Sequence, residues 1–491
     1  MNTTLRRLSA VVMVMFLALM VSTTYTQFFR AERLNADGRN VRSIFREFNV
    51  DRGPIVVAGQ PIVESVPVDT PFGFQRVFSG GDADKAQMYA PVTGFFSLVN
   101  GSTGVESAEN AFLNGQADAL WVDRLQNMLT GRKAQGSSVE LTIDPAIQQA
   151  AWDALGGQRG SIVAVDPKTG AILAMVSKPS FDPNALAVHS TGEAGQAYQD
   201  LLNADGDPLI NRAIGALYPP GSTFKLVGAA AALESGDYQG DTQISAPHRF
   251  TLPGTRTELP NFGDEVCSPT DMMSIHDAMV MSCNTAFASL AVDLGADAMR
   301  DQAAKFGFDD VFRVPMRSAV SAFPSAGDAF TPDRLALAGI GQGDVTSTPL
   351  QMAMVSAAIA NHGTLMQPYL VQTIRDPELE VVQQTQPAKV RDAVSPATAS
   401  ALTQMMVDTV ERGTGTAARI SGVQVAGKTG TAQTAQGVAP HAWFTAFAPA
   451  QDPQIAVAVI VEHGGDATSE ATGGRVAAPM ARAVIEAALS R

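Results

Sequence analysis

A serine followed three residues later by a lysine is the first pair of residues in this chain that could act together as a nucleophile and its base. Ser222-Thr223-Phe224-Lys225 follows a chain-breaking Pro219-Pro220-Gly221 run and precedes an apolar helical pattern. This order predicts a helix start that places Ser222 and Lys225 one turn apart on one face. A serine hydroxyl becomes a nucleophile when a base removes its proton, and a desolvated lysine can be that base. The alternative interpretation is an N-cap serine followed by an exposed lysine.

A second motif, Ser282-Cys283-Asn284, comes at the end of a Met-rich helical stretch. A second hydroxyl can pass a proton to a leaving group, and the Asn284 amide can hold a substrate amide. A polar helix end beside a buried cysteine is the other interpretation of this motif by itself.

A third motif, Lys428-Thr429-Gly430-Thr431, lies within a predicted strand. Glycine there permits close approach to the backbone, while Lys428, Thr429 and Thr431 can bind a carboxylate. A solvated edge strand is the alternative. All three motifs occur in order, each in the context that its chemistry requires, so the conjunction favours an acyl-transfer site over chance.

The elements that would position these motifs form an α/β (α+β) unit over residues 141–491. Two β-branched runs, residues 161–165 and 172–176, are joined by a loop with proline early and Gly170 late, which predicts a hairpin. Three more strands are expected at residues 423–432, 442–447 and 455–461. Helical patterns lie between and after these strand groups, at residues 225–233, 272–281, 349–360 and 475–489. The order predicts one antiparallel sheet built from both ends of the unit, with a helical insertion.

The N-terminus predicts a membrane anchor. Residues 8–29 carry no charge and, as a helix, would cover roughly 33 Å, enough to cross a bilayer. Arg6 and Arg7 before it favour a cytoplasmic tail, residues 1–7, and an exported remainder. A cleaved signal peptide is the alternative, although no Ala-x-Ala site follows the apolar run. Residues 30–140 then form a smaller, mixed N-terminal region.

Composition excludes several classes of protein. The chain has 491 residues, is 45% hydrophobic and 17% charged, and has a net charge of −14, which argues against global disorder and against nucleic-acid binding. The six histidines form no His-x-x-x-His pair, so no metal site is expected. The two cysteines, Cys267 and Cys283, form either a disulfide or two buried thiols.

Taken together, Ser222-x-x-Lys225, Ser282-x-Asn284 and Lys428-Thr429-Gly430 resemble the three active-site motifs of penicillin-binding proteins and serine β-lactamases. Arg52-Gly53-Pro54-Ile55 looks like the start of the N-terminal region of class B members. The runs Gly341-Gln342-Gly343, Thr348-Pro349-Leu350-Gln351 and Gly413-Thr414-Gly415 are similar to signatures of their transpeptidase domain. The region 30–140 is too short for the glycosyltransferase domain of class A members.

The resemblance implies a fold and a mechanism. The fold would be a transpeptidase domain with a central antiparallel five-stranded sheet flanked by helices. Ser222 would attack the D-Ala–D-Ala carbonyl of a peptidoglycan stem peptide with Lys225 as base, and an acceptor amine would resolve the acyl-enzyme. The remaining roles would be proton transfer by Ser282 and Lys428, donor binding by Asn284, and carboxylate binding by Thr429 and Thr431 around Gly430.

The same resemblance implies the partners. β-Lactams would trap Ser222, and a membrane glycan polymerase of the SEDS family would be a partner through the anchor and N-terminal segment. The catalytic domain would lie on the extracytoplasmic side of the cell membrane. No cofactor is implied. Trp443 and Phe444, on the strand after Lys428, either flank the cleft or pack in the core, and they are not counted among the site residues.

Two other functions fit the same motifs. A D,D-carboxypeptidase or β-lactamase would resolve the acyl-enzyme with water, but the anchor and N-terminal region favour the transpeptidase. A β-lactam sensor or scaffold would need several membrane spans, and one is visible. An α/β-hydrolase is excluded because no Gly-x-Ser-x-Gly elbow is present.

Overall fold

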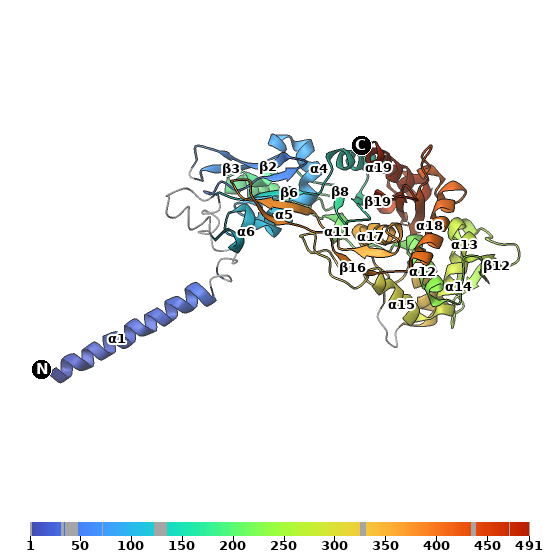
Figure 1. Cartoon of the computed structure of the whole chain (residues 1–491), viewed down its shortest axis with the longest axis horizontal. Coiled ribbons are helices and arrows are strands. Elements are labelled where there is room, and N and C mark those ends of the chain that lie inside the picture. Colours follow the sequence, from blue (N-terminus) through green and yellow to red (C-terminus); the bar gives the residue numbers. More distant parts are fainter. Residues whose placement is uncertain are drawn as a thin grey trace.

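A five-stranded antiparallel sheet organises the larger part of the molecule in the computed structural model (Figure 1). Its order is β17 (Ala426–Ala432), β18 (His441–Ala448), β19 (Ile455–Val461), β7 (Gly160–Val165) and β8 (Ile172–Lys178). The two ends of the unit therefore meet at the β19–β7 pair, where Val459 lies opposite Ile162. The expected five-stranded antiparallel sheet is confirmed.

The structure describes residues 2–30, 34, 48–70, 72–121, 135–324, 330–433, 438–470 and 472–490. Parts of the expected N-terminal region (residues 31–33, 35–47, 71 and 122–134) lie outside the described residues, as do short pieces of the expected unit 141–491.

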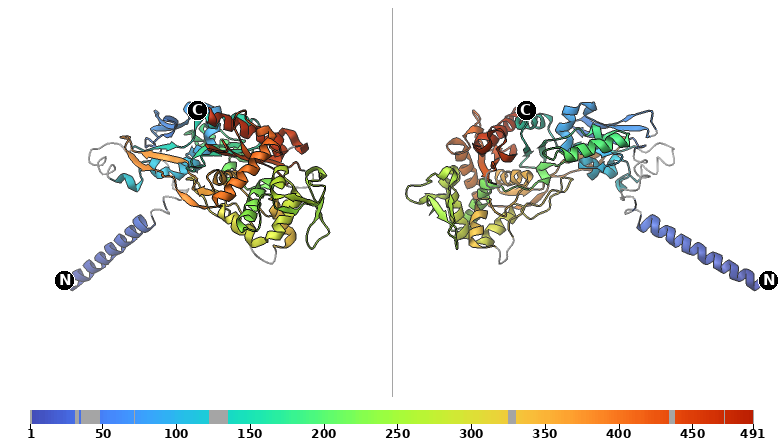
Figure 2. Two further views of the ribbon diagram at one scale, coloured as in Figure 1. Left: turned by 45° about the vertical axis from the view of Figure 1, so that its right-hand side comes forward. Right: turned by 180° about the vertical axis from the view of Figure 1, so that it is seen from behind.

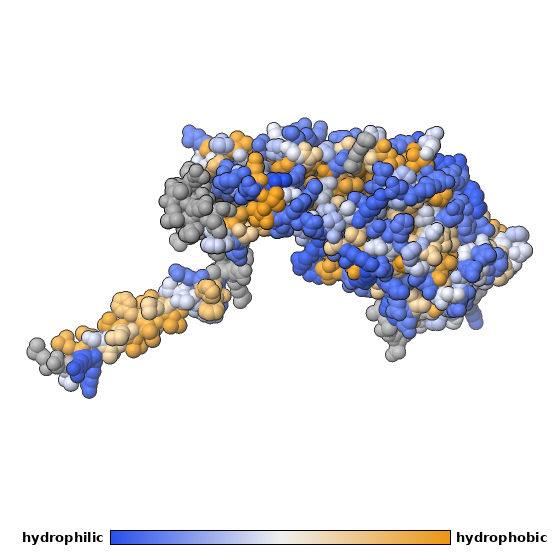
Figure 3. All heavy atoms as spheres, in the orientation of Figure 1, coloured by the Kyte–Doolittle hydropathy of each residue, from blue (hydrophilic) through white to orange (hydrophobic). Residues whose placement is uncertain are grey.

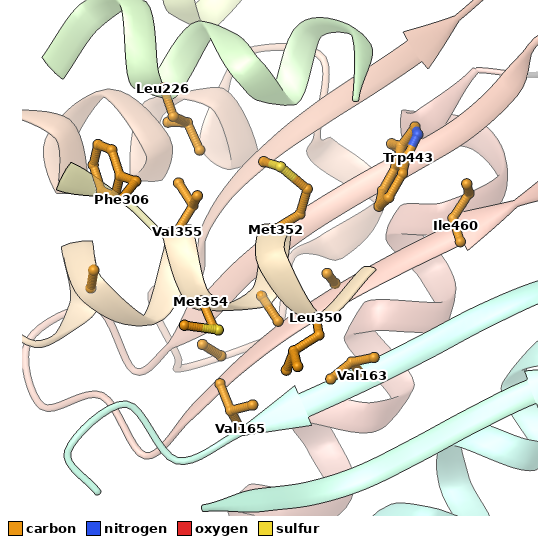
Figure 4. Packing of buried hydrophobic residues seen from close by; sticks show 14 of the residues in the cluster. Val163, Val165, Leu226, Phe306, Leu350, Met352, Met354, Val355, Trp443 and Ile460 are labelled. Atoms are coloured by element: carbon orange, nitrogen blue, oxygen red, sulfur yellow. The ribbon is translucent and has the colours of Figure 1, made fainter. Parts of the chain in front are cut away.

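Both faces of the five-stranded sheet are covered by helices because both faces are apolar. Along β19, Val457 and Val459 face one layer and Ala456 and Ile460 the other, as the two-residue period of a strand requires. The first layer contains α8 (Pro145–Leu155) and the C-terminal α19 (Ala478–Leu489). On the second, α17 (Pro349–Ala360) inserts Leu350 and Met352 among side chains of β7, β18 and β19 (Figure 4).

Helices between β8 and β17 form the insertion predicted from the sequence. It contains α9 (Asn184–Ala187), α10 (Thr191–Asn203), α11 (Arg212–Gly215), α12 (Lys225–Ser235), α13 (Ile275–Met281), α14 (Asn284–Leu294), α15 (Ala296–Lys305), α16 (Pro332–Gly339), α17 and α18 (Pro396–Glu411). Three short antiparallel pairs accompany them: β9 (Gln243–Ser245) with β12 (Met272–Ser274), β10 (Arg249–Thr251) with β11 (Glu258–Pro260), and β13 (Thr364–Met366) with β16 (Lys389–Asp392).

A second sheet takes strands from both halves of the chain. Its order is β15 (Val381–Gln384), β14 (Val371–Arg375), β6 (Ser138–Leu141), β1 (Ile55–Val57), β2 (Gln60–Pro67) and β3 (Phe74–Phe78). Figure 2 shows the hairpin of β14 and β15, in orange, beside the blue N-terminal strands. The expected division after residue 140 falls inside β6.

The N-terminal region adds helices and one short pair to this sheet: α4 (Ala83–Thr93), β4 (Phe96–Ser97), β5 (Gly101–Ser102), α5 (Gly104–Ala108) and α6 (Asn110–Leu113). Beneath them the Glu106 carboxylate is fully buried between two guanidinium groups, with 2.6 Å to Arg52 and 2.6 Å to Arg76. Arg52 begins the Arg-Gly-Pro-Ile run, so that run supplies one of the two cations in this network. A buried carboxylate is costly unless cations pair with it, and here two guanidinium groups do so.

The N-terminal helix α1 (Asn2–Thr24) continues through Tyr25–Phe29 and stands away from the rest of the molecule (Figure 1). Residues Thr3–Phe29 are long and apolar enough to cross a membrane, and none of that surface is buried. In Figure 3 the helix is an apolar rod with a hydrophilic N-terminal end.

Two predicted helix starts were wrong. Residues 272–274 form strand β12, because they pair with β9, and α13 begins only after Ser274, whose hydroxyl accepts the Asp277 N–H as an N-cap. The final helix begins at Ala478 rather than residue 475, after a single wider turn at Gly473–Ala477.

Candidate active site

Ser222 lies in a short 3-10 turn, Gly221–Phe224, and Lys225 is the first residue of α12. Gly221 has φ +55, and a Cβ on it would lie 2.8 Å from the Thr431 carbonyl oxygen. Only glycine fits such a conformation and such a close approach. The turn that carries Ser222 is therefore pressed against the edge strand β17.

Two further contacts hold this turn from outside. The Trp443 indole N–H donates to the Pro219 carbonyl at 3.0 Å, and the Gly221 N–H donates to the Gly341 carbonyl at 2.9 Å. Trp443 and Phe444 are both fully buried, so of the two alternatives for these rings the structure has core packing.

Lys225 is fully buried and hydrogen-bonded to the second motif. Its Nζ lies 2.7 Å from the Ser282 carbonyl oxygen and 2.8 Å from Asn284 Oδ1. Burial, and next the charge of Lys428, hold the pKa of Lys225 well below its usual range. A neutral amine has two N–H groups and one lone pair. The two acceptors use both N–H groups, which leaves the lone pair available to take a proton.

Ser282 has φ 60 and ψ 40, between α13 and α14 (Asn284–Leu294). A left-handed conformation costs a non-glycine residue about 1 kcal/mol. Here it turns the chain so that the Ser282 carbonyl and hydroxyl both meet lysine amino groups. Strained backbone conformations of this kind are concentrated at functional sites, where the surrounding structure imposes the geometry.

Lys428, in β17, reaches the same hydroxyl. Its Nζ lies 2.8 Å from Ser282 Oγ and 2.9 Å from the Thr429 carbonyl oxygen. Burial lowers the pKa of Lys428 to about 7. The amine can therefore change its protonation state near neutral pH.

The rest of the third motif lines the edge of β17. Thr429 Oγ1 lies 2.6 Å from Thr414 Oγ1, so the Gly413-Thr414-Gly415 run supports the Lys428 strand directly. A Cβ on Gly430 would meet Thr223 Cγ2 at 3.0 Å and the Pro220 carbonyl at 3.1 Å. With Trp443 Cβ at 2.9 Å as well, Gly430 is closely packed between the Ser222 turn and the neighbouring strand β18.

Asn284 is held by a residue that the motifs did not reveal. The buried Asn261 side chain accepts the N–H groups of Asn284 at 2.9 Å and Thr285 at 3.0 Å through Oδ1. This caps the start of α14. Cys267 and Cys283 form a disulfide with Cα atoms 6.0 Å apart, which ties the same loop to the second motif. Of the two alternatives for these cysteines, the structure has the disulfide.

Tyr218, three residues before the Ser222 turn begins, belongs to a buried polar cluster. The Tyr218 hydroxyl donates to Glu462 at 2.6 Å, and Arg212 pairs with the same carboxylate at 2.8 Å. Although burial alone would raise it, the pKa of Glu462 is lowered by the Tyr218 hydrogen bond and the charge of Arg212. The cluster holds Tyr218 in place and so fixes the chain that leads into the Ser222 turn.

The structure brings the three motifs together. One hydrogen-bonded group contains Lys225, Ser282, Asn284 and Lys428. Ser222 lies on the turn Gly221–Phe224, which contacts the strand β17 that carries Thr431. Sequence reasoning missed Asn261 and the contacts of Thr414 and Gln342. An asparagine in a loop far from Ser282 carries no local signal, because its role arises from tertiary contact.

Comparison with known families gives two matches. The family model of the penicillin binding protein transpeptidase domain matches residues 160–486. That of the penicillin binding protein A dimerisation domain matches residues 52–139. The first match contains all three motifs.

Individual proteins are similar over almost the whole chain. The peptidoglycan D,D-transpeptidase PbpA of Mycolicibacterium smegmatis is 46% identical over 100% of this chain and 99% of its own. Its counterpart in Mycobacterium tuberculosis is 45% identical with the same coverage. The ceftriaxone acyl-enzyme complex of penicillin-binding protein A from M. tuberculosis superposes with a TM-score of 0.85, at 44% identity, over 91% of this chain and 100% of that chain.

Proposed function

The chain belongs to the penicillin-binding proteins with a transpeptidase domain, and on that premise we propose that it is a peptidoglycan D,D-transpeptidase that works through a Ser222 acyl-enzyme. The observation that carries the proposal is the convergence of Lys225, Ser282 and Lys428 in one buried network beside the Ser222 turn. β-Lactams inhibit the enzyme by acylating the same serine.

Acylation begins with Lys225 in its neutral form. Its free lone pair takes the proton of Ser222 Oγ as the hydroxyl attacks the D-Ala–D-Ala carbonyl of the donor peptide. The tetrahedral oxyanion binds the backbone N–H groups of Ser222 and Thr431. Each such donor is worth roughly 3–4 kcal/mol in comparable acyl transfer.

Collapse of this intermediate breaks the bond to the terminal D-Ala. Ser282 Oγ gives its proton to the leaving nitrogen and is resupplied from the lysines, since it lies 2.8 Å from Lys428 Nζ and 3.5 Å from Lys225 Nζ. An acceptor amine then attacks the acyl-enzyme and loses its proton through the same groups. The cross-link forms and Ser222 Oγ recovers its hydrogen.

Substrate binding uses polar groups of the site that take no part in the proton transfers of acylation and cross-linking. The Asn284 carboxamide holds the donor peptide through its nitrogen, because its oxygen is bound to Lys225. The hydroxyls of Thr429 and Thr431 bind the terminal carboxylate beside Lys428 and Gly430. No step requires a cofactor.

The apolar N-terminal helix supports a single-pass anchor in the cytoplasmic membrane with the catalytic part outside. In this arrangement the anchor and the strands next to it are the surfaces that a SEDS-family glycan polymerase would contact.

The test uses the full chain in detergent micelles with a fluorescent penicillin. We expect lasting label on the wild type, none on Ser222→Ala, and wild-type label on Ser421→Ala, a matched change at an exposed serine. A stem-peptide thioester with and without D-amino acid acceptor then separates the functions. Amide product identifies a transpeptidase, whereas hydrolysis alone identifies a carboxypeptidase. Rapid drug turnover identifies a β-lactamase, and an unlabelled, folded wild type contradicts the proposal.

A further inference from the structure

The side chain of Gln342 binds the backbone of Gln433, two residues beyond Thr431. In the orientation that satisfies both pairs, its nitrogen donates to the Gln433 carbonyl at 3.2 Å, and its oxygen accepts the Gln433 N–H at 3.1 Å. One donor and one acceptor on a single residue reproduce the bond pair that a neighbouring antiparallel strand would make. Gln342 therefore stands in for one residue of a strand.

The edge at which this happens is the one next to the nucleophile. β17 is the last strand of its sheet and pairs with β18 up to Ala432, opposite His441. The N–H and C=O groups of every second residue face the same edge of a strand. Gln433 and Thr431 therefore face the same edge, and Gln342 occupies the position next after Thr431.

The residue before Gln342 contacts the other side of the site. The Gly341 carbonyl accepts the Gly221 N–H at 2.9 Å, and a Cβ on Gly341 would lie 2.1 Å from the Gly221 carbonyl oxygen. Residues 341 and 342 thus touch both segments that supply the oxyanion donors: the turn of Ser222 and the end of β17. Neither segment is the other's neighbour in sequence.

We propose that Gln342 is a positioning residue for acylation: its bonds to Gln433 hold the Thr431 N–H at the correct separation from the Ser222 N–H. The inference rests on the acyl-enzyme function proposed above. By occupying the edge after Thr431, Gln342 also ends the stretch of β17 along which a donor peptide can pair. In this account the run Gly341-Gln342-Gly343 holds the Ser222 turn and the end of β17 in position relative to each other.

The test measures acylation of the full chain by a fluorescent penicillin over a range of drug concentrations, which separates the acylation rate constant from binding. For Gln342→Ala and Gln342→Glu at pH 8 we expect the rate constant to fall about 10- to 100-fold, less than the roughly 10²–10³-fold cost of deleting an oxyanion donor. Gln199→Glu, at an exposed position of α10, is the matched control and should acylate as the wild type does.

Acid rescue distinguishes positioning from general damage. In the Gln342→Glu variant a protonated carboxyl group again presents one donor and one acceptor, so the ratio of variant to wild-type rates should rise as pH falls from 8 to 5. The Gln342→Ala ratio should stay level. Wild-type rates in both variants, or a Gln342→Glu ratio that does not change with pH, would overturn the inference. Either result leaves the acyl-enzyme function intact, whereas an unlabelled wild type refutes that function first.

Discussion

Lys225 and Lys428 approach the same hydroxyl, that of Ser282, with their Nζ atoms 3.5 and 2.8 Å from it. Both side chains are fully buried, and the charge of Lys428 lowers the pKa of Lys225. The site therefore disfavours the state in which both amines are charged.

The two lysines should differ when each is replaced by methionine. Lys225→Met removes the base proposed above, so the acylation rate constant at saturating penicillin should fall by at least about 10²-fold. Lys428→Met removes a supporting cation and should slow acylation less while weakening binding of the drug carboxylate. Stopped-flow labelling measures both quantities. Equal losses in rate would mean that Lys225 is not the principal base.

Burial of Lys428 should appear in the pH dependence of stability. Its pKa is about 7 in the folded chain and 10.5 when unfolded, so between these pH values the unfolded chain binds more protons. The free energy of unfolding should therefore gain from this group about 1.4 kcal/mol per pH unit from pH 7 to 10.5, and lose it as pH falls.

The measurement is denaturant unfolding in detergent from pH 7 to 10, comparing wild type with Lys428→Met. Replacing Lys428 also removes the charge that lowers the pKa of Lys225, so the difference in slope reports the two lysines together. Parallel slopes would show that this amine stays charged in the folded state.

Asn261 should act through its side-chain oxygen, which receives the N–H groups of Asn284 and Thr285. Asn261→Ala should lose about 1–2 kcal/mol of stability, as for a helix N-cap, and should slow acylation because Asn284 shifts. Asn261→Asp keeps the acceptor and should retain more of both. Thermal unfolding and penicillin labelling test the pair, and an Asp variant no better than Ala would rule out the capping role.

The Cys267–Cys283 disulfide closes a short loop, with a sequence separation of 16 between the two cysteines. Cys267→Ser should lower the free energy of unfolding by about 3 kcal/mol in the chain-entropy account, while leaving Ser282 and Asn284 in place. Reductant should destabilise the wild type by a similar amount and have no effect on the variant. Melting curves with and without reductant check this, and a wild type indifferent to reductant would contradict it.

The features that could be predicted from the sequence are those whose signal lies within one short segment of the chain. The strands of residues 455–461 and 172–178 alternate between two apolar layers, and proline-glycine breaks mark the Ser222 turn, so both were predictable. The role of Asn261 was not, because it depends on a loop meeting α14. The contact of Gln342 with Gln433 likewise exists only once α16 and β17 have been placed.

The same reason explains the wrong helix start at residue 272. The Met-rich pattern there suits a helix, but pairing with β9 outweighs local propensity at β12. Likewise, nothing in residues 371–384 indicated that they would complete a sheet with strands from the N-terminal region.

That shared sheet has a consequence for the interval between synthesis of the N-terminal strands and completion of the fold. Strand β6 cannot complete its pairing until β14 has been synthesised, and the hydrogen bond from the Ser138 hydroxyl to the Arg375 carbonyl spans 237 residues. Until then, β6 has an unpaired edge, the kind of surface that recruits other chains. The growing polypeptide should therefore need a holding chaperone until residues 371–375 have been added and can pair with β6. A polypeptide released before residue 371 should be degraded or aggregate.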